Sequence, residues 1–169
     1  GFQYDATWGF ADINGFRLGL ALPAPAWNAM SASERRLELV PLTWMDRVQS
    51  KYQGNEDPSS WIEQALELAD TCRDAGGLWC GLWHPNLTAP LGFPGAPEAY
   101  ARLCEQLAQR RPWFCTLTEA VSWRQRRRSA RAVQVQDGGA VTLSAGSGEG
   151  LALRDAANRT VAFVLQGAA

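Results

Sequence analysis

Extended and helical patterns alternate along residues 37–128, and this alternation restricts the fold more than any other feature of the chain. Two amphipathic stretches, 58–74 and 97–110, have the spacing of helices with one apolar face. Between them, residues 78–83 are apolar on both faces, as in a parallel strand that is covered on both sides. The repeat predicts an α/β fold built on a parallel sheet or a (β/α) barrel.

Local signals indicate where these elements begin and end. Asp57 suits the N-cap of the first helix, because its carboxylate can accept a hydrogen bond from a free backbone N–H group. Residues 37–45 are expected to be extended, with an irregularity at Pro41, which has no N–H to donate. A short strand over 113–117 and a helix capped by Thr118 should complete the repeat.

The composition changes after Arg131. The remaining residues contain no Trp, and their short alternating segments are separated by turn dipeptides such as Asp137-Gly138 and Asn158-Arg159. The sequence therefore predicts two domains, a larger one over 1–130 and a small antiparallel β appendage over 131–169.

Charge and hydropathy limit the partners. The sequence has 16 Lys and Arg against 17 Asp and Glu, a net charge of −1, which gives no general attraction to nucleic acid or to an anionic membrane. The five arginines between 124 and 131 suit a solvated helix C-terminus, where cations complement the helix dipole, better than a nucleic-acid patch. No apolar run approaches the roughly 18 residues that would span a membrane.

Four cysteines are present, and none forms a C-x-x-C pair. Zinc ribbons and thioredoxin-type chemistry are therefore not expected. The default interpretation is four buried free thiols. The cellular compartment stays open.

His84 is the only histidine, and it ends the apolar run 78–83 immediately before Pro85. A single imidazole cannot build a histidine-rich metal site, but it can act as one general acid or base because histidine titrates near neutrality. Side chains at the ends of strands are where α/β folds present chemistry. The alternative is a structural histidine that caps a buried strand.

Three stretches, Gly1–Phe10, Gly15–Gly19 and Leu82–Pro85, resemble the later half of polysaccharide deacetylases in order and spacing. The Leu42–Asp46 stretch between them also resembles this superfamily, which is grouped as carbohydrate esterase family four. The likeness covers residues 1–125. It implies a distorted (β/α) barrel, here incomplete and lacking its N-terminal strands, followed by the small antiparallel β appendage.

The resemblance implies hydrolysis of N-acetyl or O-acetyl groups on amino-sugar polymers, so the expected partner is an acetylated polysaccharide or oligosaccharide. The family uses a divalent metal, zinc or similar, held by an Asp and two His of two early motifs. Neither motif is present in this sequence, which has no Asp-Asp pair and a single histidine. We therefore expect a C-terminal portion that binds no metal and is inactive by itself, with the metal in the intact parent.

The resemblance also implies roles for particular residues. His84 would protonate the departing amine, Asp46 would orient His84, and Arg17 would contact the substrate or brace a carboxylate. The residues expected to bind substrate are Asp5, Trp8 and Trp83.

Each role has a structural alternative. Asp46 could cap a turn, Arg17 could pair with Asp12 on the surface, and the two tryptophans could pack in the core. The whole chain has alternatives too: a carbohydrate-binding or scaffold protein that kept the barrel walls and lost the chemistry, or an interaction module whose β tail is the functional part.

Overall fold

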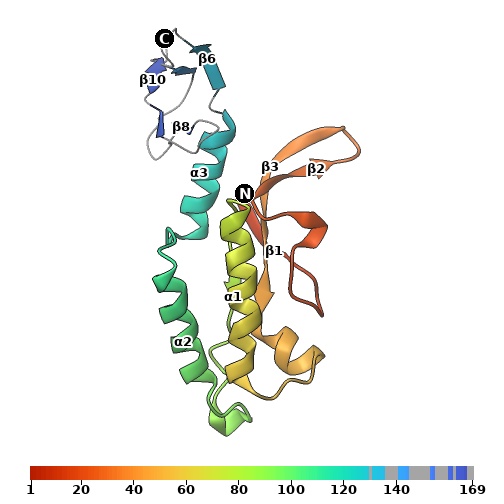
Figure 1. Ribbon diagram of the computed structural model, residues 1–169. Coiled ribbons are helices and arrows are strands. Elements are labelled where there is room, and N and C mark those ends of the chain that lie inside the picture. The colour runs from red at the N-terminus through yellow and green to blue at the C-terminus, as the bar shows by residue number, and fades with distance from the viewer. Residues whose placement is uncertain (130, 136–140, 145–152, 155–159, 162, 167–169) are drawn as a thin grey trace. The chain divides into compact units, whose positions relative to one another are not determined.

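The structure is a computed structural model, and it describes residues 1–129, 131–135, 141–144, 153–154, 160–161 and 163–166. It divides into two compact units, Gly1–Leu117 and Thr118–Ala169 (Figure 1). The second unit therefore contains nearly all of the last helix, α3 (Leu117–Ser129), together with the strands that follow it. The domain boundary near residue 131, expected from composition, stays a prediction.

The first unit contains a three-stranded sheet in the order β1-β3-β2, made of β1 (Tyr4–Trp8), β2 (Ala24–Asn28) and β3 (Ser33–Pro41). β1 runs parallel to β3, with Tyr4 opposite Glu38, whereas β2 and β3 form an antiparallel hairpin. The sequence pattern missed this hairpin, because prolines interrupt β2 and most of the first half of β3 is polar.

A second, two-stranded sheet lies further along the chain. After Pro41 the extended backbone is interrupted and resumes as β4 (Trp44–Met45), which confirms the irregularity expected there. β4 pairs in parallel with β5 (Gly81–Leu82), so that Trp44 lies opposite Gly81 and Met45 lies opposite Leu82.

The strand expected over 78–83 was wrong in length, because only Gly81–Leu82 is a strand. The N–H of Leu78 donates to the carbonyl of Ala21 (2.6 Å), outside any strand ladder. The ring of Trp79 then folds over Gly81 and fills the space that a Cβ would need there. The expectation that this run is covered on both faces was also wrong, because residues 78–83 are half-buried or exposed. An apolar run of this length does not by itself specify a buried strand.

The strand expected over 113–117 was also wrong. The backbone has no regular structure until α3 begins at Leu117, and Thr118 lies inside its first turn instead of capping it. Trp113 and Phe114 are 59 and 66 % exposed, so these apolar side chains lie largely at the surface and do not form a buried strand.

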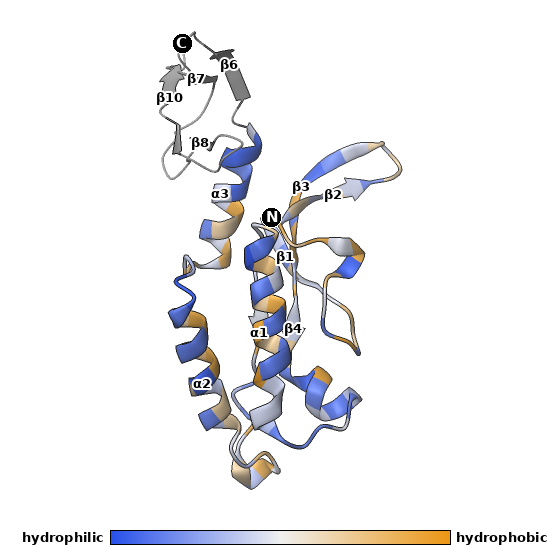
Figure 2. Ribbon diagram, in the orientation of Figure 1, coloured by the Kyte–Doolittle hydropathy of each residue, from blue (hydrophilic) through white to orange (hydrophobic). Residues whose placement is uncertain are grey.

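Two helices pack together in the first unit, α1 (Pro58–Asp74) and α2 (Ala96–Gln109). The cap expected for α1 is confirmed, because the carboxylate of Asp57 accepts the N–H of Ser59 at 2.9 Å. Both helices carry hydrophilic and hydrophobic residues at intervals along their length (Figure 2). Their apolar faces meet β4 in one cluster of Trp44, Trp61, Ile62, Ala65, Leu66, Leu87, Ala96, Ala99 and Leu103.

The thiols divide by position. Cys72, on the buried face of α1, confirms the expectation of a buried thiol, and burial raises its pKa to about 11. Burial also raises the pKa of the Cys80 thiol. For Cys104 the expectation was wrong: it follows the buried Leu103 on α2 and is exposed, because neighbouring positions on a helix face different directions.

In the second unit, three arginines (Arg126, Arg127 and Arg128) lie in the last turn of α3, where cations complement the dipole. The strands after it are β6 (Arg131–Val135), β7 (Val141–Ser144), β8 (Leu153–Arg154), β9 (Thr160–Val161) and β10 (Phe163–Gln166).

The pairs β6–β7 and β8–β9 are antiparallel, as expected for the appendage, but β10 runs parallel to β7. A parallel pair needs a long connection, and the segment that contains β8 and β9 supplies it. The expected turns at Asp137-Gly138 and Asn158-Arg159 lie outside the described residues. The described parts of the chain thus form a mixed α/β fold with small sheets, in which no closed barrel is present.

Candidate active site

Asp46 and His84 meet where β4 and β5 end. Asp46 follows Met45 directly, and His84 comes two residues after Leu82. Met45 and Leu82 are partners in the parallel β4–β5 pair. The residues that follow them therefore leave the sheet at the same end, the carboxyl end of the two strands. Strand pairing therefore brings together two residues that are 38 positions apart in the sequence.

Both carboxylate oxygens of Asp46 bind His84. Oδ1 lies 2.6 Å from the ring atom Nδ1, and Oδ2 accepts the backbone N–H of His84 at 2.5 Å. The Asp46 side chain is fully buried, whereas that of His84 is 36 % exposed. A carboxylate only accepts hydrogen bonds, so the neutral ring must carry its proton on Nδ1 and leave Nε2 as the acceptor.

Arg17 begins the short 3-10 helix η1 (Arg17–Gly19), and its side chain reaches the end of β1. Its guanidinium donates to the carbonyl of Gly9 (3.0 Å) and stacks on the ring of Trp8, with Cζ 4.4 Å from the ring centroid. The cation is thus held in place by a backbone acceptor and an aromatic face. Among the described residues, Arg17 contacts Gly9 and Trp8 and forms no ion pair with Asp12, the partner considered from the sequence.

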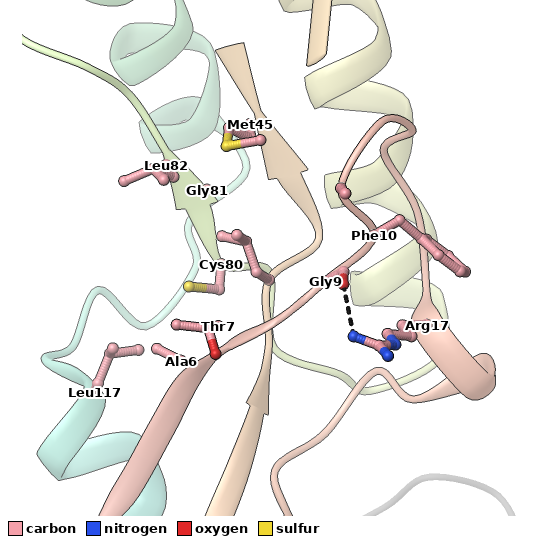
Figure 3. Close-up of a pocket in the computed structure, with 12 residues that line it drawn as sticks. Ala6, Thr7, Gly9, Phe10, Arg17, Met45, Cys80, Gly81, Leu82 and Leu117 are labelled. Atoms are coloured by element: carbon pink, nitrogen blue, oxygen red, sulfur yellow. Dashed lines mark hydrogen bonds between the residues drawn. The ribbon is translucent and has the colours of Figure 1, made fainter. Parts of the chain in front are cut away.

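A pocket of about 840 Å³ opens beside these strand ends (Figure 3). Met45 and Leu82 line it, from positions one residue before Asp46 and two residues before His84. The volume is in the range of small-molecule sites. Its lining is mainly apolar, with Thr7 and Arg17 as the polar exceptions, and consists of Ala6, Thr7, Gly9, Phe10, Ala11, Arg17, Leu42, Met45, Cys80, Gly81, Leu82 and Leu117.

The residues expected to bind substrate lie in three different settings. Asp5, in β1, accepts hydrogen bonds from the hydroxyl and the backbone N–H of Thr7, and these two bonds lower its pKa. Trp8 lies under Arg17. Trp83 contacts Trp44, with ring centroids 5.6 Å apart, on the face that the helices cover. Substrate contacts of these three residues stay predictions.

Sequence reasoning missed the apolar residues of the pocket. Met45 comes one residue before Asp46, and Leu82 comes two residues before His84. The alternation of side chains along a strand could have placed both of them in the pocket. Trp44 and Trp83 pack on the helix side, so the residue next to each of them in the chain is expected on the opposite face.

In the parts of the chain that the structure describes, no group of three or more His, Cys, Asp or Glu side chains is placed to hold a metal ion. The Asp46–His84 pair supplies one carboxylate and one imidazole, and the remaining ring nitrogen, Nε2, can accept or donate a proton. Likewise, none of the described helices is both long enough and apolar enough to cross a membrane.

Compared with protein-family models, curated proteins and solved structures, the chain shows no significant match. The features of the chain that point to a function are therefore the geometry of Asp46 and His84 and the motifs in the sequence.

Proposed function

We propose that this chain is the His84-bearing part of a polysaccharide deacetylase, which hydrolyses acetyl groups on amino-sugar polymers. The observation that carries the proposal is the buried carboxylate of Asp46, which binds both the ring and the backbone of the only histidine. A histidine that merely caps a strand has no need of such a partner. The resemblance of the surrounding motifs to deacetylases names the reaction.

In this reaction His84 acts as the general acid. Asp46 holds the proton on Nδ1 and stabilises the imidazolium, so Nε2 is the nitrogen that gives up a proton. Water adds to the acetyl carbon and releases a proton, and His84 enters the step as the imidazolium, with Nε2 also protonated. As the amide C–N bond breaks, the departing nitrogen takes the proton from Nε2, and the acetic acid formed leaves as acetate. The ring returns to the neutral form with Nδ1–H still bound to Asp46.

The pocket supports an acetylated sugar as the ligand. Its apolar walls from β4 and β5 suit an acetyl methyl group, and the fixed guanidinium of Arg17 suits the polar atoms of a sugar. We propose an acetylated polysaccharide or oligosaccharide as the partner on this ground.

The metal of such enzymes polarises the acetyl carbonyl and activates water. The residues described here do not fit it, since they contain no suitable cluster of ligands, and we assign no step to it. We propose that zinc or a similar ion belongs to motifs outside this sequence and that the chain alone is inactive. The corresponding fold would be an incomplete (β/α) barrel, which the parallel pairs β1–β3 and β4–β5 support.

A second candidate is a carbohydrate-binding protein without catalysis. One observation favours it: Arg17 and Trp8 form a preformed cation and aromatic surface beside a pocket, which can bind a sugar without proton transfer.

The test measures acetate release from an acetylated chitooligosaccharide by the full-length polypeptide that carries these residues. Asp46→Asn should lower turnover strongly while sugar binding persists. Asp12→Asn, a substitution of the same kind at an exposed position, is the matched control and should leave turnover unchanged. Binding without turnover in the wild-type protein would favour the second candidate.

A further inference from the structure

One edge of β4 pairs with a side chain instead of a strand. β5 occupies the other edge. On the free edge, the N–H of Met45 donates to Oδ1 of Asn14 (2.8 Å), and Nδ2 of Asn14 lies 3.4 Å from the carbonyl oxygen of Met45. The N–H and C=O of one strand residue point to the same edge, so the Asn14 amide pairs with Met45 as a neighbouring strand would.

The same amide is joined to two glutamines. Oε1 of Gln64, on α1, accepts Nδ2 of Asn14 at 2.8 Å and Nε2 of Gln49 at 2.5 Å. An amide oxygen has two lone pairs, so it can accept both bonds at once. Gln49 is 4 % exposed and lies in the helical turn η2 (Val48–Tyr52). We name Asn14, Gln64 and Gln49 the amide network.

The amide network reaches the backbone on both sides of Asp46. Asn14 binds the residue immediately before it, and Gln49 is three residues after it. Both side-chain oxygens of Asp46 are used by His84. The position of the carboxylate is therefore set by the backbone that carries it, together with His84 itself.

We propose that Asn14, Gln64 and Gln49 are positioning residues, which hold Asp46 where its carboxylate fixes the orientation and tautomer of His84. This inference rests on the proposed function of the Asp46–His84 pair. It explains why three amide side chains from a loop, a helix and a turn converge beside a two-residue strand, which has few bonds of its own to fix it.

The experiment uses ¹⁵N NMR of the 169-residue chain, in which His84 gives the only histidine signals. The readout is the ratio of the Nδ1–H to the Nε2–H tautomer in the neutral ring. Gln64→Leu removes the shared acceptor and should lower this ratio about fivefold, the effect expected for the net contribution of one hydrogen bond. Asn14→Ala should lower it at least as much.

Two variants serve as controls. Gln64→Glu keeps an oxygen that can accept both amide N–H groups, so the ratio should stay within about twofold of the wild type. Asn28→Ala removes an asparagine whose Oδ1 also accepts a backbone N–H, that of Met30, but in the exposed turn of the β2–β3 hairpin. It should leave the ratio unchanged.

An unchanged ratio in folded Gln64→Leu or Asn14→Ala protein would overturn the inference. Loss of folding in both, with Gln64→Glu still folded, would also overturn it, because the amide network would then stabilise the fold and not position Asp46. A different result would contradict the proposed function: a wild-type chain whose neutral His84 ring shows no preference for the Nδ1–H tautomer.

Discussion

The two faces of the β4–β5 pair differ in what covers them. On one face, Trp44 is buried in one cluster with Trp61 of α1, and Trp83 stacks with Trp44 and packs on Trp61 and on Tyr100 of α2. On the other face, Met45 and Leu82 line the pocket, and Leu82 is 40 % exposed. Residues adjacent in the chain thus belong to a closed aromatic core and to an open pocket.

The face covered by the helices and the pocket face are therefore expected to contribute differently to the stability of the fold and to the proposed proton transfer. Burial of large apolar side chains against α1 and α2 supplies the free energy that holds β4 and β5 in place. The pocket face contributes less burial, but Asp46 and His84 leave the strands beside it. We therefore expect substitutions on the helix face to change stability, and those at the strand ends to change proton transfer.

The largest expected effect is on turnover. In the proposed parent deacetylase, His84→Ala should lower kcat by about 10² to 10⁴-fold, or about 3–5 kcal/mol of barrier, because a general acid acts mainly in the transition state. KM and the melting temperature should change little. Steady-state kinetics and thermal melting check this, and near-normal turnover by a folded variant would make His84 a structural residue.

The helix face should give the largest effect on stability. Trp61 is fully buried, and its indole N–H donates to the carbonyl of Asn55 at 3.0 Å. Trp61→Ala should lower the free energy of unfolding by about 3–5 kcal/mol. Leu82→Ala, on the pocket face, should cost about 1 kcal/mol or less because the side chain is partly exposed. If denaturant titrations gave equal losses of unfolding free energy for the two variants, the two faces would not differ in their contribution to stability.

The buried thiol of Cys72, on α1, should make a smaller and pH-dependent contribution to the free energy of unfolding. Burial raises the pKa of Cys72 from 9.0 to about 11, so its thiol form stabilises the fold fully below about pH 9. This contribution, about 2–3 kcal/mol at 1.36 kcal/mol per pKa unit, should be lost as the pH rises through 11. The difference in unfolding free energy between wild type and Cys72→Ala should narrow over that range. A constant difference would contradict a buried thiol.

The smallest effect is expected at the surface between α1 and α2. Asp70 accepts from Nε and Nη2 of Arg110 at 2.9 and 3.0 Å, and this pairing lowers the pKa of the Asp70 carboxyl. Its stabilising effect is present above the ordinary pKa of an aspartate and is lost as the pH falls through the lowered value. Asp70→Asn should lower the melting temperature slightly at pH 7 and not at strongly acidic pH. A loss that persists in acid would point to packing instead of charge.

The sequence predicted α1 well because its signals are local: Asp57 caps the helix, and the apolar stripe that follows faces one core. It failed at 78–83 because the fold of Trp79 over Gly81 depends on tertiary packing, which no short pattern contains. It selected Asp46 and His84 as a pair, but the distances between them come from the β4–β5 register.

The amide network could not be predicted in the same way. Asn14 and Gln64 are 50 residues apart and belong to a loop and a helix. No sequence pattern around an asparagine or a glutamine indicates a hydrogen-bond partner at that separation. Only the three-dimensional structure shows that Asn14 takes the place of a neighbouring strand beside Met45.

The proposed function requires that Asp46 hold the proton of His84 on Nδ1 and leave Nε2 for proton transfer. The most direct measurement is the ¹⁵N NMR spectrum of the neutral His84 ring in the wild-type chain, which contains no other histidine. We expect the neutral ring to be protonated predominantly on Nδ1, because the carboxylate of Asp46 can only accept a hydrogen bond from it. A ring protonated mainly on Nε2, the form that free histidine prefers, would contradict it.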